Sequence, residues 1–202
     1  MPLLIVLSGP SGAGKDTVLN RMKELDLHCH YMVHCHYVVT LTTRPRRPGE
    51  KNGADYHFTS EAEFQEMIQR GELLEWAKVY GNWYGVPKQQ VKQALDRGED
   101  VVMKLDVQGA ATIKNLFPEA VLIFLTPPSI EEQAKRLQQR KSESNAELEL
   151  RMKTTQEEMK HLPLFDYLVV NSQGEVDSAI SQIKAIITAE KQRVNPRVIE
   201  LK

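Results

Sequence analysis

The chain has 202 residues, enough for one domain with a sizeable core, and its 26 Lys and Arg balance its 27 Asp and Glu. No overall charge therefore favours nucleic acid or a membrane, no apolar run approaches the ~20 residues that span a bilayer, and no cleavable signal precedes the first strand. Two cysteines are too few for a disulfide framework, so we expect a protein of the reducing cytoplasm that holds any anionic ligand with a local group of cations.

A glycine-rich loop follows the first predicted strand, the apolar run at residues 3–7. Apolar side chains recur at helical spacing after the loop, so its glycines lie at a turn from strand to helix. In that setting the backbone N–H groups and the helix N-terminus bind phosphates, and the lysine reaches the outer ones. We therefore predict a nucleotide-phosphate site rather than a plain tight turn. Its residues are Gly9, Pro10, Ser11, Gly12, Ala13, Gly14, Lys15, Asp16 and Thr17.

Asp16 departs from this loop pattern, which has Ser or Thr after the lysine as a hydroxyl ligand for Mg²⁺. A carboxylate also binds Mg²⁺, directly or through water, and Thr17 offers a hydroxyl one residue later. We therefore expect Asp16 or Thr17 to contact the metal.

Residues 28–33 are followed by a near-copy of themselves at 34–39, and both copies are rich in His and Cys. Both residue types are zinc ligands, so a metal site is one interpretation. We favour the other, a short tandem duplication that leads into a strand in which Tyr37 and Val39 share one face.

A basic loop follows at residues 40–50 and contains Arg44, Arg46 and Arg47. Its prolines prevent a regular helix, so the loop presents guanidinium groups, which match phosphate oxygens. Tyr56 can add a hydroxyl donor. The alternative is a solvated basic loop, and this segment alone does not decide between the two.

Short elements of mixed type follow the basic loop. Ser60 and Glu63 form a capping box that predicts a helix, which Gly71 ends. A strand, a hairpin-like aromatic stretch and a second short helix come next. We therefore predict that residues 40–98 form a strand-rich insertion.

Strands alternate with helices in the rest of the chain. Buried strands are predicted near 100–106, 120–126 and 167–171, and together with the first strand they indicate a parallel α/β sheet flanked by helices. A polar helical stretch at 130–161 contains three arginines, and an amphipathic helix comes last. We expect the tail after Arg193 to be loosely held.

The chain resembles guanylate kinases over nearly its whole length. The glycine loop is common to many nucleotide-binding proteins, whereas the motifs of the insertion are specific to this family. The motifs that carry the resemblance are Gly9–Lys15, Thr42–Glu50, Gly53–Phe58, Leu74–Trp76, Gly81–Gly85 and Asp106–Gly109.

The resemblance implies a P-loop NTPase-type parallel sheet with an inserted GMP-binding subdomain and a helical lid. It also implies transfer of the γ-phosphoryl group of ATP to GMP with Mg²⁺, by positioning and charge stabilisation. The single domain at 1–202 would divide into a core at 1–39, 99–129 and 162–191, an insertion at 40–98, a lid at 130–161 and a tail at 192–202.

The roles of individual residues follow where the motifs match. The residues implied to bind GMP are Thr40, Arg44, Arg47, Tyr56, Glu75, Tyr84 and Asp106. Those implied to be catalytic are Lys15, Arg136, Arg140 and Arg151, with Asn171 implied to contact ATP. Physical reasoning supports Glu75 in particular, because guanine presents two adjacent N–H donors to one carboxylate and adenine does not. The alternative is an ordinary glutamate in an apolar strand.

Two further departures from the family's pattern lie near the same site. Lys104 stands where many relatives have an acid, which leaves Asp106 as the one acid at the end of that strand. We hypothesise that Asp16 and Lys104 offset each other's charge across the cleft. Val86 replaces a hydroxyl residue that often contacts the base.

Two alternatives to an active guanylate kinase stay open. A kinase for another phosphorylated acceptor, such as ribose 1,5-bisphosphate, also has Gly-Lys-Asp in its loop, but it should lack the Thr-Thr-Arg-Pro and Glu-Trp segments found here. A non-catalytic guanylate-kinase-like binding module has typically lost the glycine loop, which is intact in this chain.

Overall fold

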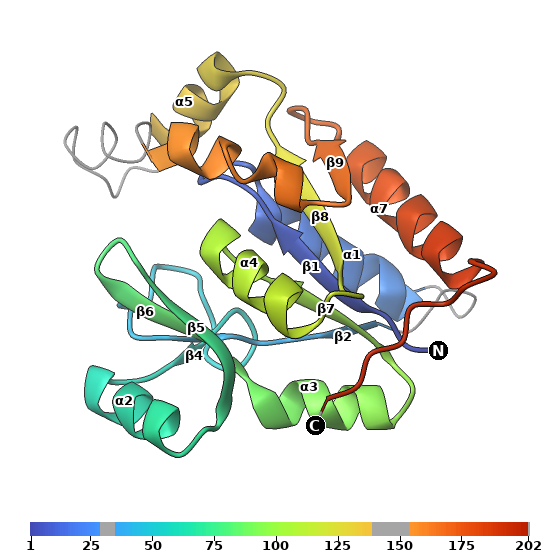
Figure 1. Ribbon diagram of the computed structural model, residues 1–202. Coiled ribbons are helices and arrows are strands. Elements are labelled where there is room, and N and C mark those ends of the chain that lie inside the picture. The colour runs from blue at the N-terminus through green and yellow to red at the C-terminus, as the bar shows by residue number, and fades with distance from the viewer. Residues whose placement is uncertain (29–34, 139–153, 202) are drawn as a thin grey trace.

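The computed structural model describes residues 1–28, 35–138 and 154–201. The strands of its main sheet are β1 (Leu4–Ser8), β2 (Cys35–Tyr37), β7 (Asp100–Lys104), β8 (Val121–Thr126) and β9 (Tyr167–Val170). Within the described residues they lie in the order β2-β7-β1-β8-β9, and every neighbouring pair is parallel (Figure 1). The predicted parallel α/β sheet is confirmed.

Helices cover both faces of the main sheet (Figure 1). They are α1 (Lys15–His28) and α7 (Val176–Lys191) on one face, and α3 (Lys88–Asp96) and α4 (Val107–Leu116) on the other. The central strand β1 divides the core between them, because Leu3, Ile5 and Leu7 pack with α1 and α7. Leu4 and Val6 pack with α3 and α4. This alternation is what a strand buried on both faces requires.

A small second sheet lies beside the main one (Figure 1). Its strands are β3 (Leu41–Thr42), β4 (His57–Phe58), β5 (Leu73–Val79) and β6 (Asn82–Pro87), in the order β4-β3-β6-β5. β5 and β6 form a hairpin that turns at Tyr80 and Gly81, both of which have positive φ. The helix α2 (Glu61–Gln69) begins at the predicted capping box, in which Ser60 and Glu63 bond reciprocally, and its buried Phe64 packs on the sheet.

Among the residues that the structure describes between β8 and β9, three segments are helical. They are α5 (Ile130–Gln138), the helical residues 154–159 and the 3-10 turn η1 (Leu162–Leu164). Residues 29–34 of the His- and Cys-rich repeat and the predicted residues Arg140 and Arg151 lie outside the described residues. In the described part, no group of three or more His, Cys, Asp or Glu could hold a metal ion. No helix among these residues is long and apolar enough to cross a membrane.

Two expectations from the sequence are wrong. The tail is anchored to the rest of the domain. Arg197 is only 9% exposed and donates to the Glu190 carboxylate at 2.8 and 3.0 Å. Two residues later, Ile199 packs against the α3–α4 side of the core. Periodicity cannot reveal an anchor that consists of ion pairs and a few apolar contacts. β2 ends at Tyr37, so Val39 lies outside the strand, and its N–H donates to a side chain of α3 instead.

Candidate active site

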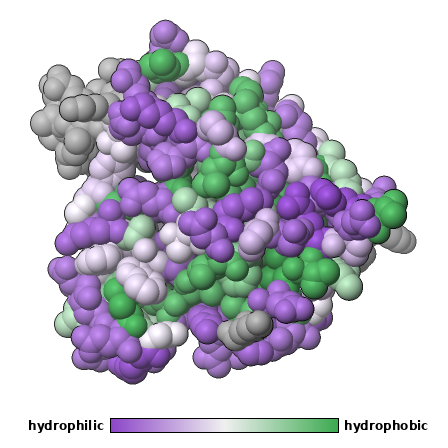
Figure 2. All heavy atoms as spheres, in the orientation of Figure 1, coloured by the Kyte–Doolittle hydropathy of each residue, from purple (hydrophilic) through white to green (hydrophobic). Residues whose placement is uncertain are grey.

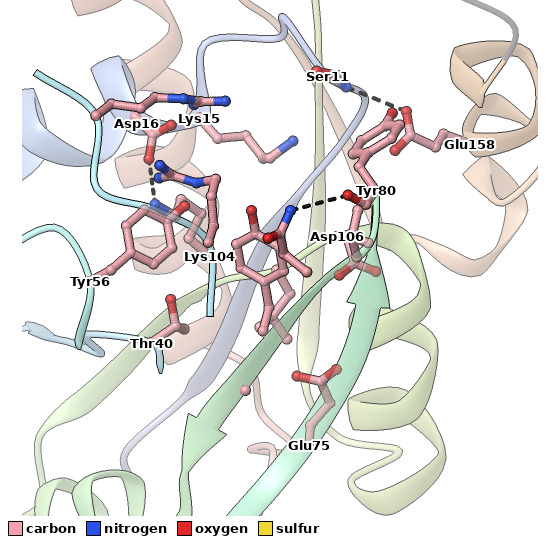
Figure 3. A pocket seen from close by; sticks show the side chains of 17 residues that line it. Ser11, Lys15, Asp16, Thr40, Tyr56, Glu75, Tyr80, Lys104, Asp106 and Glu158 are labelled. Atoms are coloured by element: carbon pink, nitrogen blue, oxygen red, sulfur yellow. Dashed lines mark hydrogen bonds and ion pairs between the residues drawn. The ribbon is translucent and has the colours of Figure 1, made fainter. Parts of the chain in front are cut away.

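A cavity of about 170 Å³ lies between the ends of the main-sheet strands and the second sheet (Figure 3). Its lining joins three parts of the chain, namely the glycine loop, the second sheet with its basic loop, and the segment after β7. Of the residues singled out in the sequence, those that line it are Ser11, Lys15, Asp16, Thr40, Arg44, Arg47, Tyr56, Glu75, Tyr84, Lys104 and Asp106. The structure therefore brings all seven predicted GMP-binding residues to one cavity with three residues of the glycine loop, whereas Thr17, Arg136 and Asn171 do not line it.

The glycine loop runs from β1 into α1 and depends on its glycines. Gly9, Gly12 and Gly14 have φ of +138°, +85° and +87°, which side chains disfavour. A Cβ atom on Gly14 would lie 2.5 Å from the side-chain nitrogen of Asn171. That nitrogen donates to the carbonyl of Ala13 at 2.8 Å, so Asn171 supports the loop from behind. A direct contact between Asn171 and ATP stays a prediction.

Lys15 is the first residue of α1, and its ammonium donates to two carbonyls of the loop, those of Gly9 and Pro10. Burial lowers the pKa of this ammonium, and the nearby carboxylates of Glu158 and Asp16 partly offset that effect. The loop therefore combines backbone N–H groups, a helix N-terminus and a partly buried cation, as a phosphate site requires.

Two buried residues that contact the loop were missed by sequence reasoning. The Ser11 N–H donates to the carboxylate of Glu158 at 3.3 Å. The side-chain nitrogen of Gln133 donates to the Ser11 carbonyl at 2.6 Å and to the Thr155 hydroxyl at 2.8 Å. In the sequence, both lie in a polar helical stretch, and nothing local separates them from solvent-facing residues because their partners are far away in the chain.

Arg136 of α5 also lies next to the loop. Its guanidinium donates to the Asn171 carbonyl at 2.8 Å and contacts the Glu132 carboxylate. Arg136 is thus linked to the residue that supports the loop. Because Arg140 and Arg151 fall outside the described residues, their grouping with Arg136 stays a prediction.

The basic loop presents two of its three arginines to the cavity. Arg44 and Arg47 line it, whereas Arg46 is exposed. Glu50 accepts two bonds from the Arg44 guanidinium, at 2.7 and 3.1 Å, and one from the Arg47 N–H, at 2.7 Å. Burial alone would raise the pKa of Glu50, but these bonds hold that pKa below its ordinary value. Glu50, which was not singled out from the sequence, therefore orients Arg44.

Two tyrosines extend this group of arginines. The ring centroids of Tyr56 and Tyr84 are 6.1 Å apart, and the Arg44 guanidinium lies 5.4 Å from the Tyr56 centroid. Thr40, just before β3, is buried and lines the same cavity. Guanidinium groups and phenol hydroxyls at one wall fit a phosphate.

Glu75 is a buried acid that lines the cavity. It lies on β5, is 3% exposed, and within the described part of the chain its carboxylate has no hydrogen bond or ion pair. Burial, with the charge of Asp106 nearby, raises the pKa of Glu75 to about 8. Gly109 of α4 gives the carboxylate room, since a Cβ atom there would lie 2.7 Å from Glu75 Oε1. A buried acid without a protein partner is a candidate ligand-binding group.

Lys104 is the last residue of β7, and Asp106 lies two residues later. The Lys104 ammonium forms an ion pair with Asp16, as hypothesised, and lies 4.1 Å from the ring centroid of Tyr56 (Figure 3). Burial alone would lower the pKa of Lys104, but these two neighbours raise it. Asp106 caps α4 by accepting from two of its backbone N–H groups, at 2.8 and 3.0 Å. Val86 is fully buried in the core.

The geometry of this cavity agrees with the comparisons with known proteins. The family model described as guanylate kinase matches residues 1–190. The chain belongs to the guanylate kinase family. It is 45% identical to "Guanylate kinase 2, chloroplastic/mitochondrial" of Oryza sativa subsp. japonica, over 99% of this chain and 68% of that protein. It is 44% identical to the guanylate kinase of Bacillus subtilis (strain 168), over 96% of this chain and 94% of that protein.

A solved structure supports the same assignment. The crystal structure of guanylate kinase from Anaplasma phagocytophilum matches with a TM-score of 0.78 and 32% identity, over 96% of this chain and 88% of that chain. The resemblance stated from the sequence motifs is thereby confirmed, and the chain is a member of a family of nucleoside monophosphate kinases. Two of the departures noted in the sequence, Asp16 and Lys104, contact each other in the cavity.

Proposed function

We propose that this kinase transfers the γ-phosphoryl group of ATP to GMP and so forms ADP and GDP. The observation that carries the proposal is the burial of Glu75 in the same cavity as Lys15 and Arg44. A phosphate cradle and an arginine pair in one cavity fit two phosphorylated substrates. The buried carboxylate fits the two adjacent N–H donors of guanine.

On the donor side, the backbone N–H groups of the glycine loop and the Lys15 ammonium bind the phosphates of ATP. Arg136, with Arg140 and Arg151, stabilises the charge of the group in transfer. Asn171 holds the loop through its bond to Ala13 and lies near the bound ATP.

On the acceptor side, arginines and hydroxyls bind the GMP phosphate, while acids and Thr40 face the base. The residues are Arg44, Arg47, Tyr56 and Tyr84 for the phosphate, and Thr40, Glu75 and Asp106 for the base. An oxygen of the GMP phosphate attacks the γ-phosphorus of ATP, the bond from that phosphorus to the β–γ bridging oxygen breaks, and ADP leaves. The protein positions the reactants and stabilises charge, without a covalent intermediate.

Phosphoryl transfer from ATP implies Mg²⁺, and the start of α1 fits this ion. Asp16 and Thr17 carry the hard oxygen donors that Mg²⁺ prefers, and both residues are exposed. We propose that one of them contacts the metal. When bound to ATP, Mg²⁺ neutralises charge on the phosphates and favours departure of ADP.

We further propose that the single domain works in separate parts. These are the core at 1–39, 99–129 and 162–191, the GMP-binding insertion at 40–98, the lid at 130–161 and the tail at 192–202. The separate sheet formed by β3 to β6 supports the division. The insertion and the lid move toward the glycine loop when both nucleotides bind, which excludes water from the reaction.

The test is an assay of ADP formation with Mg-ATP and one acceptor at a time, namely GMP, AMP, UMP or ribose 1,5-bisphosphate. We expect turnover with GMP and far slower turnover with the others. No turnover with GMP at saturating Mg-ATP contradicts the proposal. Turnover with ribose 1,5-bisphosphate alone favours the alternative kinase, and no turnover with any acceptor favours the binding module.

A further inference from the structure

Lys104 lies where the two halves of the cavity meet. It ends β7, and its side chain is only 10% exposed. Its ammonium contacts the carboxylate of Asp16, which directly follows the loop lysine on α1. On the other side it lies 4.1 Å from the ring centroid of Tyr56, which belongs to the acceptor side (Figure 3). The ammonium is therefore held between the glycine loop, which binds the donor phosphates, and the residues proposed to bind the acceptor.

The surroundings of Lys104 are those of a phosphate ligand. The Arg44 guanidinium lies against the same Tyr56 ring, at 5.4 Å from its centroid, and Arg47 lines the same cavity. An ammonium has three N–H donors, so Lys104 can keep its bond to Asp16 and still donate to a phosphate oxygen.

We propose that Lys104 binds the phosphate of the acceptor nucleotide together with Arg44 and Arg47, and that Asp16 is a positioning residue that fixes its ammonium. The proposal rests on the GMP kinase function proposed above and adds to it a phosphate ligand that the family's usual acid at this position could not provide. An acid there would repel the acceptor phosphate, whereas Lys104 attracts it.

The test compares GMP with guanosine, which lacks the phosphate. Calorimetry measures the affinity of both ligands without ATP and in the presence of EDTA, so that bound metal plays no part. The variants are Lys104→Met, Lys104→Arg and the control Lys92→Met, which removes an exposed lysine of α3 that pairs with Asp96. Because guanosine binding depends on the base site, it also shows that each variant is folded.

In Lys104→Met we expect the affinity for GMP to fall by about tenfold to a hundredfold, as for the loss of one hydrogen bond to a charged group, with guanosine unchanged. Lys104→Arg keeps most of the GMP affinity, and Lys92→Met keeps all of it. If Lys104→Met has the same ratio of GMP to guanosine affinity as the wild type, the proposal is overturned. A wild type that binds neither ligand overturns the GMP kinase function itself.

A double-variant cycle tests the role of Asp16. If Asp16 acts on GMP through Lys104, Asp16→Asn changes the GMP affinity only while Lys104 is present. Asp16→Asn combined with Lys104→Met then binds GMP as Lys104→Met alone does. An equal effect of Asp16→Asn in both backgrounds shows that Asp16 acts independently and overturns its positioning role.

Discussion

Replacing Glu75 by Gln tests whether the buried carboxylate binds guanine and, in the free protein, lowers the free energy of unfolding. Burial and the charge of Asp106 raise the pKa of Glu75 from 4.5 to about 8. The folded-state pKa is the higher of the two, so ionisation of Glu75 destabilises the folded protein. This destabilisation is absent below pH 4.5 and grows as the pH rises to 8. Glutamine carries no charge, so E75Q escapes this loss.

The size of the effect follows from the two pKa values. Each pH unit between them changes the free energy of unfolding by about 1.4 kcal/mol. From pH 5 to pH 7 the wild type therefore loses about 2.5 kcal/mol relative to E75Q, and above pH 8 the difference levels off. Urea unfolding at pH 5, 6, 7 and 8, followed by circular dichroism, measures it.

The same substitution weakens guanine binding. The oxygen of a carboxamide accepts from one guanine N–H, but its N–H₂ group is a donor that faces the second guanine donor. We therefore expect the GMP affinity of E75Q to fall by about tenfold to a hundredfold. In the wild type, guanosine binds more tightly as the pH rises toward 8, because the bound base needs the carboxylate, and E75Q lacks this dependence. Guanosine is the better probe here because the phosphate of GMP titrates in the same range.

A stability difference between wild type and E75Q that stays constant from pH 5 to pH 8 refutes the reasoning from burial. An E75Q protein that binds GMP as tightly as the wild type refutes the role in guanine recognition. The control is E66Q, because Glu66 lies on the exposed side of α2 and pairs with Arg70. Its stability should differ from that of the wild type by less than about 1 kcal/mol.

Three other predictions concern the loop, the tail and closure. Gly14→Ala forces a side chain into positive φ against Asn171, so we expect ATP binding to be lost in a titration while circular dichroism still shows a folded protein. Arg197→Ala leaves the buried Glu190 carboxylate without its main partner, and urea unfolding should show a loss of about 3 kcal/mol with unchanged turnover. ADP and GMP together should reduce the radius of gyration measured by small-angle scattering, and no compaction contradicts closure.

Local patterns predicted the elements well and the contacts between them poorly. The Ser60–Glu63 capping box and the turn into α1 are contained within a few residues, so the sequence shows them directly. The bonds from the loop to Glu158 and Gln133 join residues that are 147 and 122 positions apart. No spacing rule connects such residues, so their roles emerge only when the fold brings them together.

Asp16 illustrates the same limit at a residue that the pattern did single out. Read within the glycine loop, its carboxylate has one obvious role, that of a metal ligand. The structure adds a partner 88 residues away, and the ion pair with Lys104 changes what both side chains can do. An acid beside the donor phosphates is repulsive alone, but next to a lysine it holds a cation at the acceptor side. Two departures from a family's pattern can therefore form one arrangement, which becomes visible only when their side chains are found in contact.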